Sequence, residues 1–215
     1  MICQFPNLAI YDLDGTLVDS IYQVHKIINE LRAELGKHPM NVGQLTPWIS
    51  LGGIELIINA LEVRCEEAKP HLKTFRARYL AEKTPKHLVY EGVFEALEHF
   101  QERDCNLAIC TNKPRNLVEK ILRETDLAAY FACVVAGGDL PTQKPNPANL
   151  LHCLEHFALQ PSQAVFIGDS RVDQMTAESA DVQFIFFSAG YDDGVFGIES
   201  GFTINRHSET SSLFQ

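Results

Sequence analysis

Short runs of apolar residues recur along the chain, and a turn or a polar cluster follows each of them. Runs of four or so residues that are apolar at every position are typical of strands buried on both faces of a parallel sheet. The pattern predicts strands over residues 8–11, 107–110, 133–136, 164–167 and 184–187.

Segments with the helical spacing of apolar residues lie between these runs in the second half of the chain. Two of these segments begin with a proline, Pro114 or Pro147. The first turn of a helix tolerates proline because the N–H groups there need no partner within the helix. Regular alternation of strands and helices is typical of a doubly wound α/β fold with a parallel sheet. The predicted helices cover residues 93–102, 114–123, 147–157 and 171–180.

Residues 21–83 interrupt this alternation, because they contain no convincing strand. We therefore predict a helical domain of residues 17–85 inserted into an α/β core of residues 1–16 and 86–215, with Pro85 ending the helical pattern. Helical periodicity within the insertion fits residues 21–35, 54–62 and 66–82.

Composition narrows the class of protein. Of the 215 residues, 46% are hydrophobic and 21% are charged, as in an ordinary soluble enzyme. The formal net charge of −10 argues against nucleic acid and membranes as partners, because both bind basic surfaces. The six cysteines form no C-x-x-C pair, and we interpret them as small buried thiols of a reducing cytosol.

The sequence shows no targeting signal, which agrees with the cytosolic location that the cysteines suggest. The N-terminus lacks the pattern of a signal peptide, and no apolar run approaches the length of a membrane span. We expect a cytoplasmic protein. The last eight residues are polar and are expected to be loosely ordered, and the sequence makes no prediction of the oligomeric state.

Two aspartates, Asp12 and Asp14, follow the first predicted strand and precede a glycine. Carboxylates held close together repel each other, and burial increases that cost unless a cation lies between them. Residues two apart on a strand share a face, and ligands of α/β sheets bind beyond the carboxyl ends of the strands. Oxygen ligands of this kind suit Mg²⁺. The alternative is a capping aspartate followed by a turn aspartate.

Thr111 and Asn112 follow the next predicted strand, and their hydroxyl and amide groups suit the oxygens of a phosphate. Taken alone, Thr-Asn before a helix is more often a helix cap. Two prolines, Pro145 and Pro147, lie just after Lys144 and stiffen the loop that contains it. A rigidly held ammonium could neutralise a carboxylate and a phosphoryl oxygen together, although a solvated loop lysine is the simpler interpretation.

Asp169 follows the predicted strand of residues 164–167, and Asp173 comes four residues later. Asp169 could bind a metal directly, and Asp173 could hold a metal-bound water. Alternatively, Asp169 or Ser170 caps the next helix and Asp173 lies at its positive end. Together the four clusters offer a nucleophile, a proton-transfer group, phosphate donors, a cation and metal ligands. Independent helix caps have no reason to supply that set.

These clusters resemble the four motifs of the haloacid dehalogenase (HAD) superfamily, and the resemblance to its phosphohydrolases extends over nearly the whole chain. Within the superfamily, the chain is most similar to phosphoglycolate phosphatases, through residues 111–114, 144–147, 168–170 and 190–191. The resemblance implies a HAD-like Rossmannoid core with an inserted helical cap. The motifs match, in order, residues 12–20, Thr111, Lys144, and Asp169 with Asp173.

The resemblance implies that a small phosphate monoester is hydrolysed in two steps. Asp12 attacks phosphorus and forms an aspartyl phosphate. Asp14 protonates the leaving alcohol and then deprotonates the attacking water. Thr111 and the Asn112 amide hold the transferring oxygens, while Lys144 offsets the negative charge on Asp12 and on the phosphoryl group.

Mg²⁺ is the cofactor that the resemblance implies, because it screens the repulsion between a carboxylate and a phosphate. Its implied ligands are Asp12, the backbone carbonyl of Asp14, Asp169 and a phosphoryl oxygen, while Asp173 orients the metal shell. The metal residues expected are thus Asp12, Asp14, Asp169 and Asp173.

The inserted helices, by the same resemblance, form a cap that excludes bulk water and selects the leaving group. Residues 48–53 look like a cap loop that faces the substrate. Gly52 and Gly53 would let the backbone approach a small ligand there. An ordinary turn between helices, with Trp48 as its one aromatic anchor, is the alternative.

Other functions use the same scaffold. A sugar phosphomutase resembling β-phosphoglucomutase would pass the phosphoryl group from Asp12 to a second hydroxyl instead of water. Nucleotidase and pyrophosphatase activities also fit the motifs. A dehalogenase is disfavoured because its chemistry needs neither a metal nor an acid at position 14. A catalytically silent binding protein is disfavoured because every chemically required residue is present.

Overall fold

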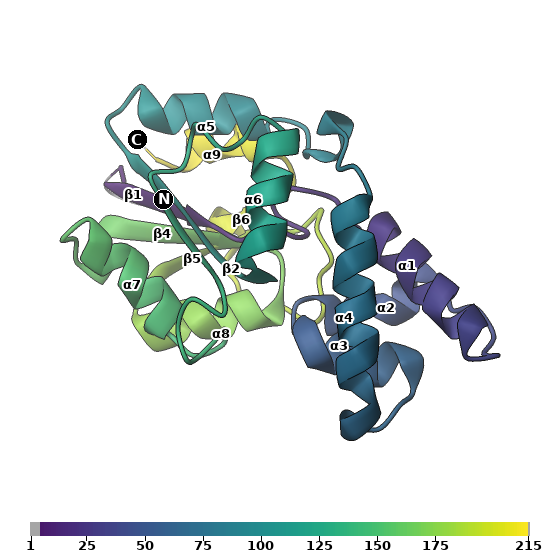
Figure 1. The fold of residues 1–215 in the computed structure, drawn as a ribbon. Coiled ribbons are helices and arrows are strands. Elements are labelled where there is room, and N and C mark those ends of the chain that lie inside the picture. The colour runs from purple at the N-terminus through teal and green to yellow at the C-terminus, as the bar shows by residue number, and fades with distance from the viewer. Residues whose placement is uncertain (1–4, 215) are drawn as a thin grey trace.

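The computed structural model describes residues 5–214, and these residues form a parallel six-stranded sheet with helices on both faces (Figure 1). The strands run in the order β3-β2-β1-β4-β5-β6 across the sheet. They are β1 (Leu8–Tyr11), β2 (Asn106–Pro114), β3 (Cys133–Gly137), β4 (Ala164–Gly168), β5 (Gln183–Phe187) and β6 (Thr203–Ile204).

The strand order reverses at β1, which lies between β2 and β4. Tyr11, the last residue of β1, pairs with Ile109 of β2 and Ile167 of β4. The carboxyl ends of these three strands therefore meet at one edge of the sheet. Polar side chains that follow them share the crevice where α/β proteins of this type bind ligands.

Helices cover the two faces of the sheet, as the alternation of strands and helices predicts. Ala9 and Tyr11 pack into one core cluster, together with apolar residues of α5 and α6. Leu8 and Ile10 point to the opposite face and pack with α7 and α8. The doubly wound fold is thus confirmed. The covering helices are α5 (Val93–Gln101), α6 (Arg115–Glu124), α7 (Ala148–His156) and α8 (Arg171–Ala180).

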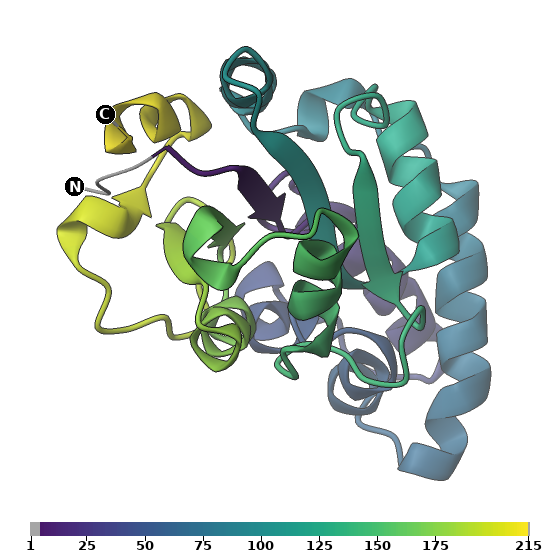
Figure 2. The same cartoon turned by 90° about the vertical axis from the view of Figure 1, so that its left-hand side faces the viewer.

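Residues 21–81 form the inserted helical segment, which lies at one end of the sheet (Figure 1). Its helices pack on one another, and α4 also contacts α6, which lies between the segment and β3 (Figure 2). The insertion is helical, as expected. It consists of α1 (Ile21–Glu34), α2 (Val42–Ile49), α3 (Gly53–Leu61) and α4 (Cys65–Ala81).

Two connections join the helical segment to the sheet, and they run side by side. The Asp19 amide donates to the Leu88 carbonyl at 2.8 Å, and the Tyr90 amide donates to the Leu17 carbonyl at 3.1 Å. The two connections are therefore adjacent, which is the arrangement expected of a hinge between the helical segment and the sheet. The expected domain boundaries near residues 17 and 85 remain a prediction.

Helix α2 was not predicted from the sequence. It is short, it contains Gly43 and Pro47, and both residues weaken a helical pattern. Asn41 stabilises its start, because the Asn41 side chain accepts from the Gln44 amide while the Gln44 side chain accepts from the Asn41 amide. A local cap thus offsets a poor helical sequence.

The expectation of a loosely ordered C-terminus is wrong for the described residues. Residues 210–213 form α9, and the Phe214 side chain is buried. The Phe214 ring packs 5.4 Å from the Phe5 ring and 5.8 Å from the Phe100 ring, between centroids. The buried Phe214 side chain therefore holds the otherwise polar C-terminal residues against the core. Short 3₁₀ turns cover residues 86–88, 161–163, 200–202 and 207–209.

The cysteines are free thiols in the part of the chain that the structure describes. Cys65 is exposed at the start of α4, so the expectation of burial is wrong there, while Cys3 lies outside the described residues. No helix within residues 5–214 combines the length and apolar character needed to cross a bilayer. The buried cysteines are Cys105, Cys110, Cys133 and Cys153.

Candidate active site

Three buried carboxylates meet at the edge of the sheet where β1 and β4 end. Asp12 follows β1, Asp169 follows β4, and Asp173 lies in the first turn of α8. One oxygen from each lies within 4.8 Å of the others. Their residues are 6%, 1% and 0% exposed, respectively. We call Asp12, Asp169 and Asp173 the acidic cluster.

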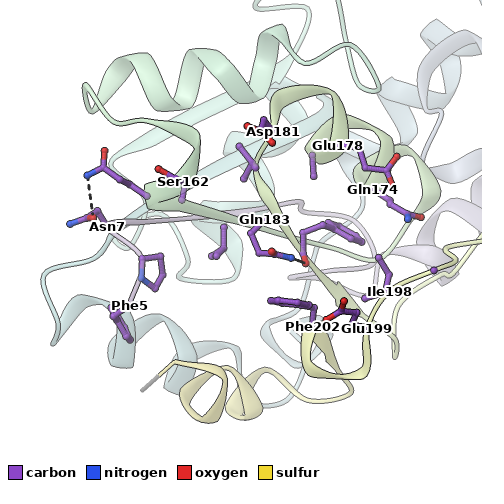
Figure 3. A pocket seen from close by; sticks show the side chains of 18 residues that line it. Phe5, Asn7, Ser162, Gln174, Glu178, Asp181, Gln183, Ile198, Glu199 and Phe202 are labelled. Atoms are coloured by element: carbon purple, nitrogen blue, oxygen red, sulfur yellow. Dashed lines mark hydrogen bonds between the residues drawn. The ribbon is translucent and has the colours of Figure 1, made fainter. Parts of the chain in front are cut away.

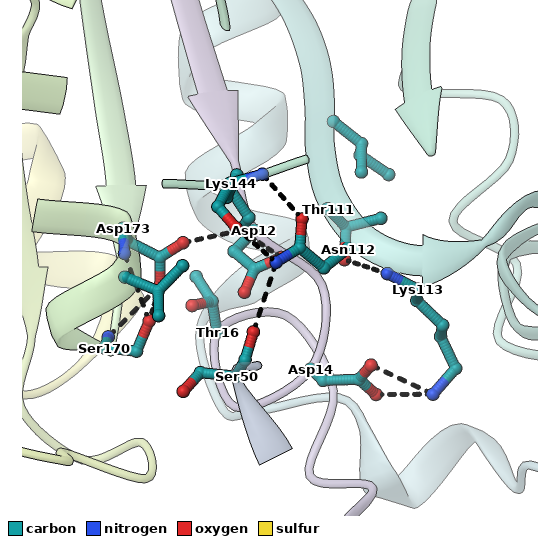
Figure 4. A network of polar contacts seen from close by, with 12 residues as sticks. Asp12, Asp14, Thr16, Ser50, Thr111, Asn112, Lys113, Lys144, Ser170 and Asp173 are labelled. Atoms are coloured by element: carbon teal, nitrogen blue, oxygen red, sulfur yellow. Dashed lines mark hydrogen bonds and ion pairs between the residues drawn. The ribbon is translucent and has the colours of Figure 1, made fainter. Parts of the chain in front are cut away.

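Lys144 contacts two members of the acidic cluster (Figure 4). Its Nζ lies 2.9 Å from Asp12 Oδ1 and 2.5 Å from Asp173 Oδ1. The residue is 3% exposed, so the interpretation as a solvated loop lysine is wrong. Burial disfavours the ammonium, but the carboxylates of Asp12 and Asp173 outweigh burial and raise the pKa of Lys144 above its ordinary value.

The acidic cluster carries more negative charge than Lys144 can balance. Three ionised carboxylates against one ammonium leave an excess of two negative charges. Burial raises the pKa of Asp12 to about 6, against the lowering effect of Lys144. Burial, followed by the charges of Asp173 and Asp12, also raises the pKa of Asp169 well above its usual range.

A divalent cation fits this arrangement. Asp12 Oδ1 lies beside the Lys144 ammonium but accepts no hydrogen bond from the described residues. Buried negative charge that no cation balances is costly, and a cation of charge two would offset the excess that Lys144 leaves. The donors are all carboxylate oxygens, which Mg²⁺ prefers over the softer ligands of zinc or copper.

The Asp169 side chain is fixed by neighbours from two stretches of the predicted motifs, although no role was predicted for them individually. The Thr16 hydroxyl donates to Asp169 Oδ1 at 2.5 Å, and the Tyr191 amide donates to Asp169 Oδ2 at 2.8 Å. Gly15 has φ +82°, and a Cβ there would lie 2.1 Å from Asp169 Oδ2. A Cβ on Gly190 would lie 2.3 Å from Asp169 Cβ. Glycine is therefore needed on both sides of this carboxylate.

Asp173 has two roles at the start of α8. Its amide donates to the Ser170 hydroxyl at 3.2 Å, and that hydroxyl donates to Asp173 Oδ2 at 2.6 Å. Ser170 is therefore the N-cap of α8, which was one of the two interpretations of this stretch. The other oxygen of Asp173 holds Lys144. The capping interpretation is therefore confirmed for Ser170, while a metal role for Asp173 remains a prediction.

The Asp14 side chain points away from the acidic cluster (Figure 4). Both of its oxygens accept from Lys113 Nζ at 2.9 Å, and one also accepts from the Ser20 hydroxyl. The two carboxylates line one cavity, as expected, but only Asp12 enters the acidic cluster. The reason is that β1 ends at Tyr11, so strand alternation does not apply to the loop that follows.

Lys113 completes this second ion pair. Burial disfavours its ammonium, but Asp14 outweighs burial and raises the pKa of Lys113 above its ordinary value. The ammonium also lies 4.2 Å from the centroid of the Tyr79 ring, on α4. The sequence predicted no separate role for Lys113, which lies within residues 111–114. Its position at the end of a predicted strand, opposite two acids, was the available signal.

Thr111 and Asn112 lie inside β2, which continues to Pro114 with an irregular register, and not after it as predicted. The interpretation as a cap of α6 is wrong, because Pro114 is the N-cap of that helix. The Asn112 side chain accepts from the Lys144 amide at 2.9 Å and donates to the Lys144 carbonyl at 3.0 Å. Asn112 therefore holds the loop that presents Lys144.

A cavity of about 60 Å³ lies between the sheet edge and the helical segment, and it brings most predicted residues together. Gly52 and Gly53 adopt φ values of +63° and +48°, which favour glycine. The predicted loop of residues 48–53 is shorter than expected, because Trp48 and Ile49 belong to α2 and Gly53 begins α3. The predicted residues that line the cavity are Asp12, Asp14, Gly52, Gly53, Thr111 and Asn112.

Ser50 links this loop to the sheet domain. Its hydroxyl donates to Asp193 Oδ2 at 2.6 Å, and its carbonyl accepts from the Asn112 side chain at 3.3 Å. Asp193 Oδ1 in turn accepts from the Arg171 amide at 2.5 Å, at the start of α8. The sequence showed no sign of this link, because Asp193 lies in an irregular segment far from Ser50 along the chain.

A second cavity, of about 640 Å³, lies at the other end of the sheet (Figure 3). It is lined by residues that precede or begin β1, β4 and β5, such as Asn7, Ala164 and Gln183. Its charged lining residues are Glu178, Asp181 and Glu199, and it has no lysine or arginine among the described residues. An anionic phosphate is therefore poorly suited to it, despite its larger volume.

Comparison with known proteins agrees with this site. The model of the haloacid dehalogenase-like hydrolase family matches residues 9–187. Phosphoglycolate phosphatase 1 of Pseudomonas aeruginosa is 33% identical over 198 residues, which make up 89% of this chain and 72% of that protein. A phosphoglycolate phosphatase of Cereibacter sphaeroides is 35% identical over 188 residues, which make up 85% of each protein.

Solved structures are similar as well. A protein from Haemophilus somnus, described as a predicted phosphoglycolate phosphatase, superimposes with a TM-score of 0.84 and 26% identity. The match covers 97% of this chain and 98% of the other. The chain therefore belongs to the haloacid dehalogenase-like hydrolase family. The expectation that it is a hydrolase of the phosphatase type is confirmed.

Proposed function

We propose that the chain is a Mg²⁺-dependent phosphatase that hydrolyses a small phosphate monoester, with phosphoglycolate as the best candidate. The observation that supports this most is the position of Asp12. Its carboxylate belongs to the acidic cluster and also lines the cavity beneath the helical segment. One oxygen can face a cation while the other faces an ester.

Asp12 is the proposed nucleophile. It attacks phosphorus and forms an aspartyl phosphate, which water then hydrolyses. Asp14 lines the same cavity and is the proposed acid and base, first for the leaving alcohol and then for the attacking water. Lys113 and Ser20 hold the Asp14 carboxylate in one orientation, and this orientation keeps it apart from the acidic cluster.

The transferring oxygens are held, in this proposal, by the Thr111 hydroxyl and by the Asn112 amide, both at the cavity. Lys144 offsets charge on Asp12 and on the phosphoryl group, and its contacts with Asp12 and Asp173 fix its ammonium. The Asn112 side chain supports this arrangement indirectly, because it bonds to the backbone of Lys144.

Mg²⁺ would be held by Asp12, the backbone carbonyl of Asp14 and Asp169, with Asp173 orienting the metal shell. When bound, the ion reduces the repulsion between the Asp12 carboxylate and an anionic ester. Thr16 and the Tyr191 amide keep Asp169 in place for this role. The free buried thiols support the proposed reducing, cytoplasmic location.

The helical segment is the proposed cap, residues 17–85. It contributes Gly52, Gly53 and apolar side chains to the cavity, so it can exclude water and select the leaving group. The cavity of about 60 Å³ is far smaller than the roughly 300 Å³ or more of a site for a drug-sized ligand. This favours a small leaving group over the sugar of a phosphomutase or the nucleoside of a nucleotidase.

A substrate panel tests the proposal. The purified protein is assayed with Mg²⁺, and phosphate release is measured from phosphoglycolate, a hexose phosphate, a nucleoside monophosphate and pyrophosphate. We expect the highest kcat/KM for phosphoglycolate and loss of the activity on chelation with EDTA, restored by added Mg²⁺. Isomerised hexose phosphate without phosphate release would instead indicate a mutase. Failure to cleave any ester would contradict the proposal.

A further inference from the structure

The cavity beneath the helical segment has one positive charge that no carboxylate neutralises. Four charged side chains line it: Asp12, Asp14, Lys113 and Arg76. Asp14 is paired with Lys113, and Asp12 is paired with Lys144 just outside the lining. Arg76, in α4, forms no ion pair with any carboxylate of residues 5–214, although it is only half-exposed.

The other arginine nearby in α4 behaves differently. Arg78 lies 3.4 Å from Glu30 and 2.5 Å from Glu34, both on α1. Two residues along an α-helix are separated by about 200° around its axis, so Arg76 and Arg78 face in different directions. One arginine therefore joins α4 to α1, and the other faces the cavity.

The surroundings of Arg76 favour binding of an anion. Beside it the helical segment lines the cavity with apolar side chains, including Phe75 and Leu56. An apolar wall lowers the local dielectric and strengthens the attraction between a guanidinium and an opposite charge. A guanidinium also presents a planar pair of donors that matches a carboxylate or phosphate in two hydrogen bonds.

The opposite wall already holds the reacting group. Asp12, Thr111 and Asn112 line the cavity from the sheet side, where the phosphoryl group is proposed to bind. A ligand that reaches from there to Arg76 must cross a cavity of only about 60 Å³, far below the roughly 300 Å³ or more of a site for a drug-sized ligand. The part of the substrate that faces Arg76 is therefore a short leaving group.

We propose that Arg76 binds a second anionic group on the leaving-group side of the substrate, and that the enzyme thereby selects short phosphate esters with such a group. This inference rests on the proposed phosphatase function. Phosphoglycolate has this chemistry, because its leaving group ends in a carboxylate. Arg76 is a specificity residue in this account, since it touches the leaving group and takes no part in the transfer of the phosphoryl group.

Binding measurements in an Asp12→Asn background test the proposal without depending on turnover. Calorimetry with Mg²⁺ compares phosphoglycolate with 2-hydroxyethyl phosphate, which has a neutral hydroxyl in place of the carboxylate. The parent should prefer phosphoglycolate. Arg76→Gln should reduce that preference roughly 10- to 100-fold, because a charge-assisted pair is lost. Arg76→Lys should retain part of it.

Arg78→Gln is the matched control, because it removes the same charge from the same helix, two residues away from Arg76. It should leave the preference unchanged. The proposal is contradicted if the parent binds both esters equally, if the preference survives Arg76→Gln, or if Arg76→Gln weakens both esters to the same extent. Circular dichroism melting shows that each variant is folded.

Turnover by the wild-type protein separates this inference from the proposed function. If the wild type releases no phosphate from these two esters or from the substrate panel above, the proposed phosphatase function fails. The calorimetric preference and its dependence on Arg76 would still decide whether the residue binds the second anion.

Discussion

The two sides of the cavity are built in different ways. On the sheet side, the acidic cluster and Lys144 come from segments that the parallel sheet holds together, and they are almost fully buried. On the helical side, Arg76, Gly52 and Gly53 come from an insertion joined to the sheet by two adjacent connections. The first side is buried and highly charged, whereas the second is mostly apolar.

This difference suggests that the sheet side carries out the chemistry and the helical side selects the substrate. Substitutions on the sheet side should abolish chemistry, because each charge there depends on the others. Substitutions on the helical side should change which ester is preferred and how tightly it binds. Variants on both sides test these two roles, in decreasing order of expected effect.

Asp12→Asn should lower kcat by more than about 10⁴-fold, because a neutral amide is a poor nucleophile and the two-step route is lost. Phosphate release in the presence of Mg²⁺ measures the effect, with circular dichroism to verify the fold. The control variant is Asp181→Asn, which makes the same change at an exposed aspartate at the end of α8 and should retain activity. Substantial turnover by Asp12→Asn would remove the nucleophile assignment.

Asp14→Asn should lower kcat by roughly 10²- to 10⁴-fold, the range expected when an acid–base group is lost. The loss should shrink for esters with good leaving groups, such as p-nitrophenyl phosphate, which need less protonation. Rates for both kinds of ester should be compared in the same variant. Equal losses for good and poor leaving groups would indicate that Asp14 has only a structural role with Lys113.

Mg²⁺ should stabilise the protein more at neutral than at acid pH. Burial raises the pKa of Asp12 to about 6, above its unfolded value of 3.8. The unfolded chain thus binds fewer protons between these values, and the metal-free protein loses roughly 3 kcal/mol as the pH rises through them. A cation that binds the ionised cluster restores this stability.

Thermal melting with and without Mg²⁺ measures this effect. The difference in Tm should be larger at about pH 8 than at about pH 5. His207 titrates in the opposite direction, because burial lowers its pKa to about 4 and its neutral form is the stable one in the fold. Comparing the two metal conditions at each pH cancels that contribution. A Tm difference independent of pH would show that Mg²⁺ does not bind the cluster.

Ser50→Ala should have the smallest effect, a change of a few-fold in KM. It removes the hydrogen bond between Ser50 and Asp193, which links the helical segment to the sheet domain, and one hydrogen bond contributes about 1 kcal/mol. Ser162→Ala, at an exposed position near the distant cavity, is the control. If both variants behave like the wild type, the Ser50 link has no part in substrate binding.

The sheet side of the site could be predicted from the sequence to a large extent. Asp12, Asp169 and Lys144 follow apolar runs or stiff loops, and the strands of a parallel sheet end at one edge. Backbone pairing between β1, β2 and β4 then brings those residues together without any need to know side-chain contacts. The fold class followed from the same pattern.

The helical side was much less predictable. Helix α2 was missed because Gly43 and Pro47 hide its periodicity. The orientation of Asp14 could not be read from strand alternation, because β1 ends before it. Contacts such as Ser50 with Asp193 join segments that are 143 residues apart, and no local pattern encodes them. Arg76 looked like any other charged residue of an amphipathic helix.

The most direct test of the account is a crystal structure with Mg²⁺ and beryllium fluoride, which mimics a phosphoryl group. We predict beryllium bonded to a carboxylate oxygen of Asp12, and Mg²⁺ in contact with Asp12 and Asp169. A Mg²⁺ ion bound away from these two aspartates, or a phosphoryl mimic attached to another carboxylate, would contradict the central claim.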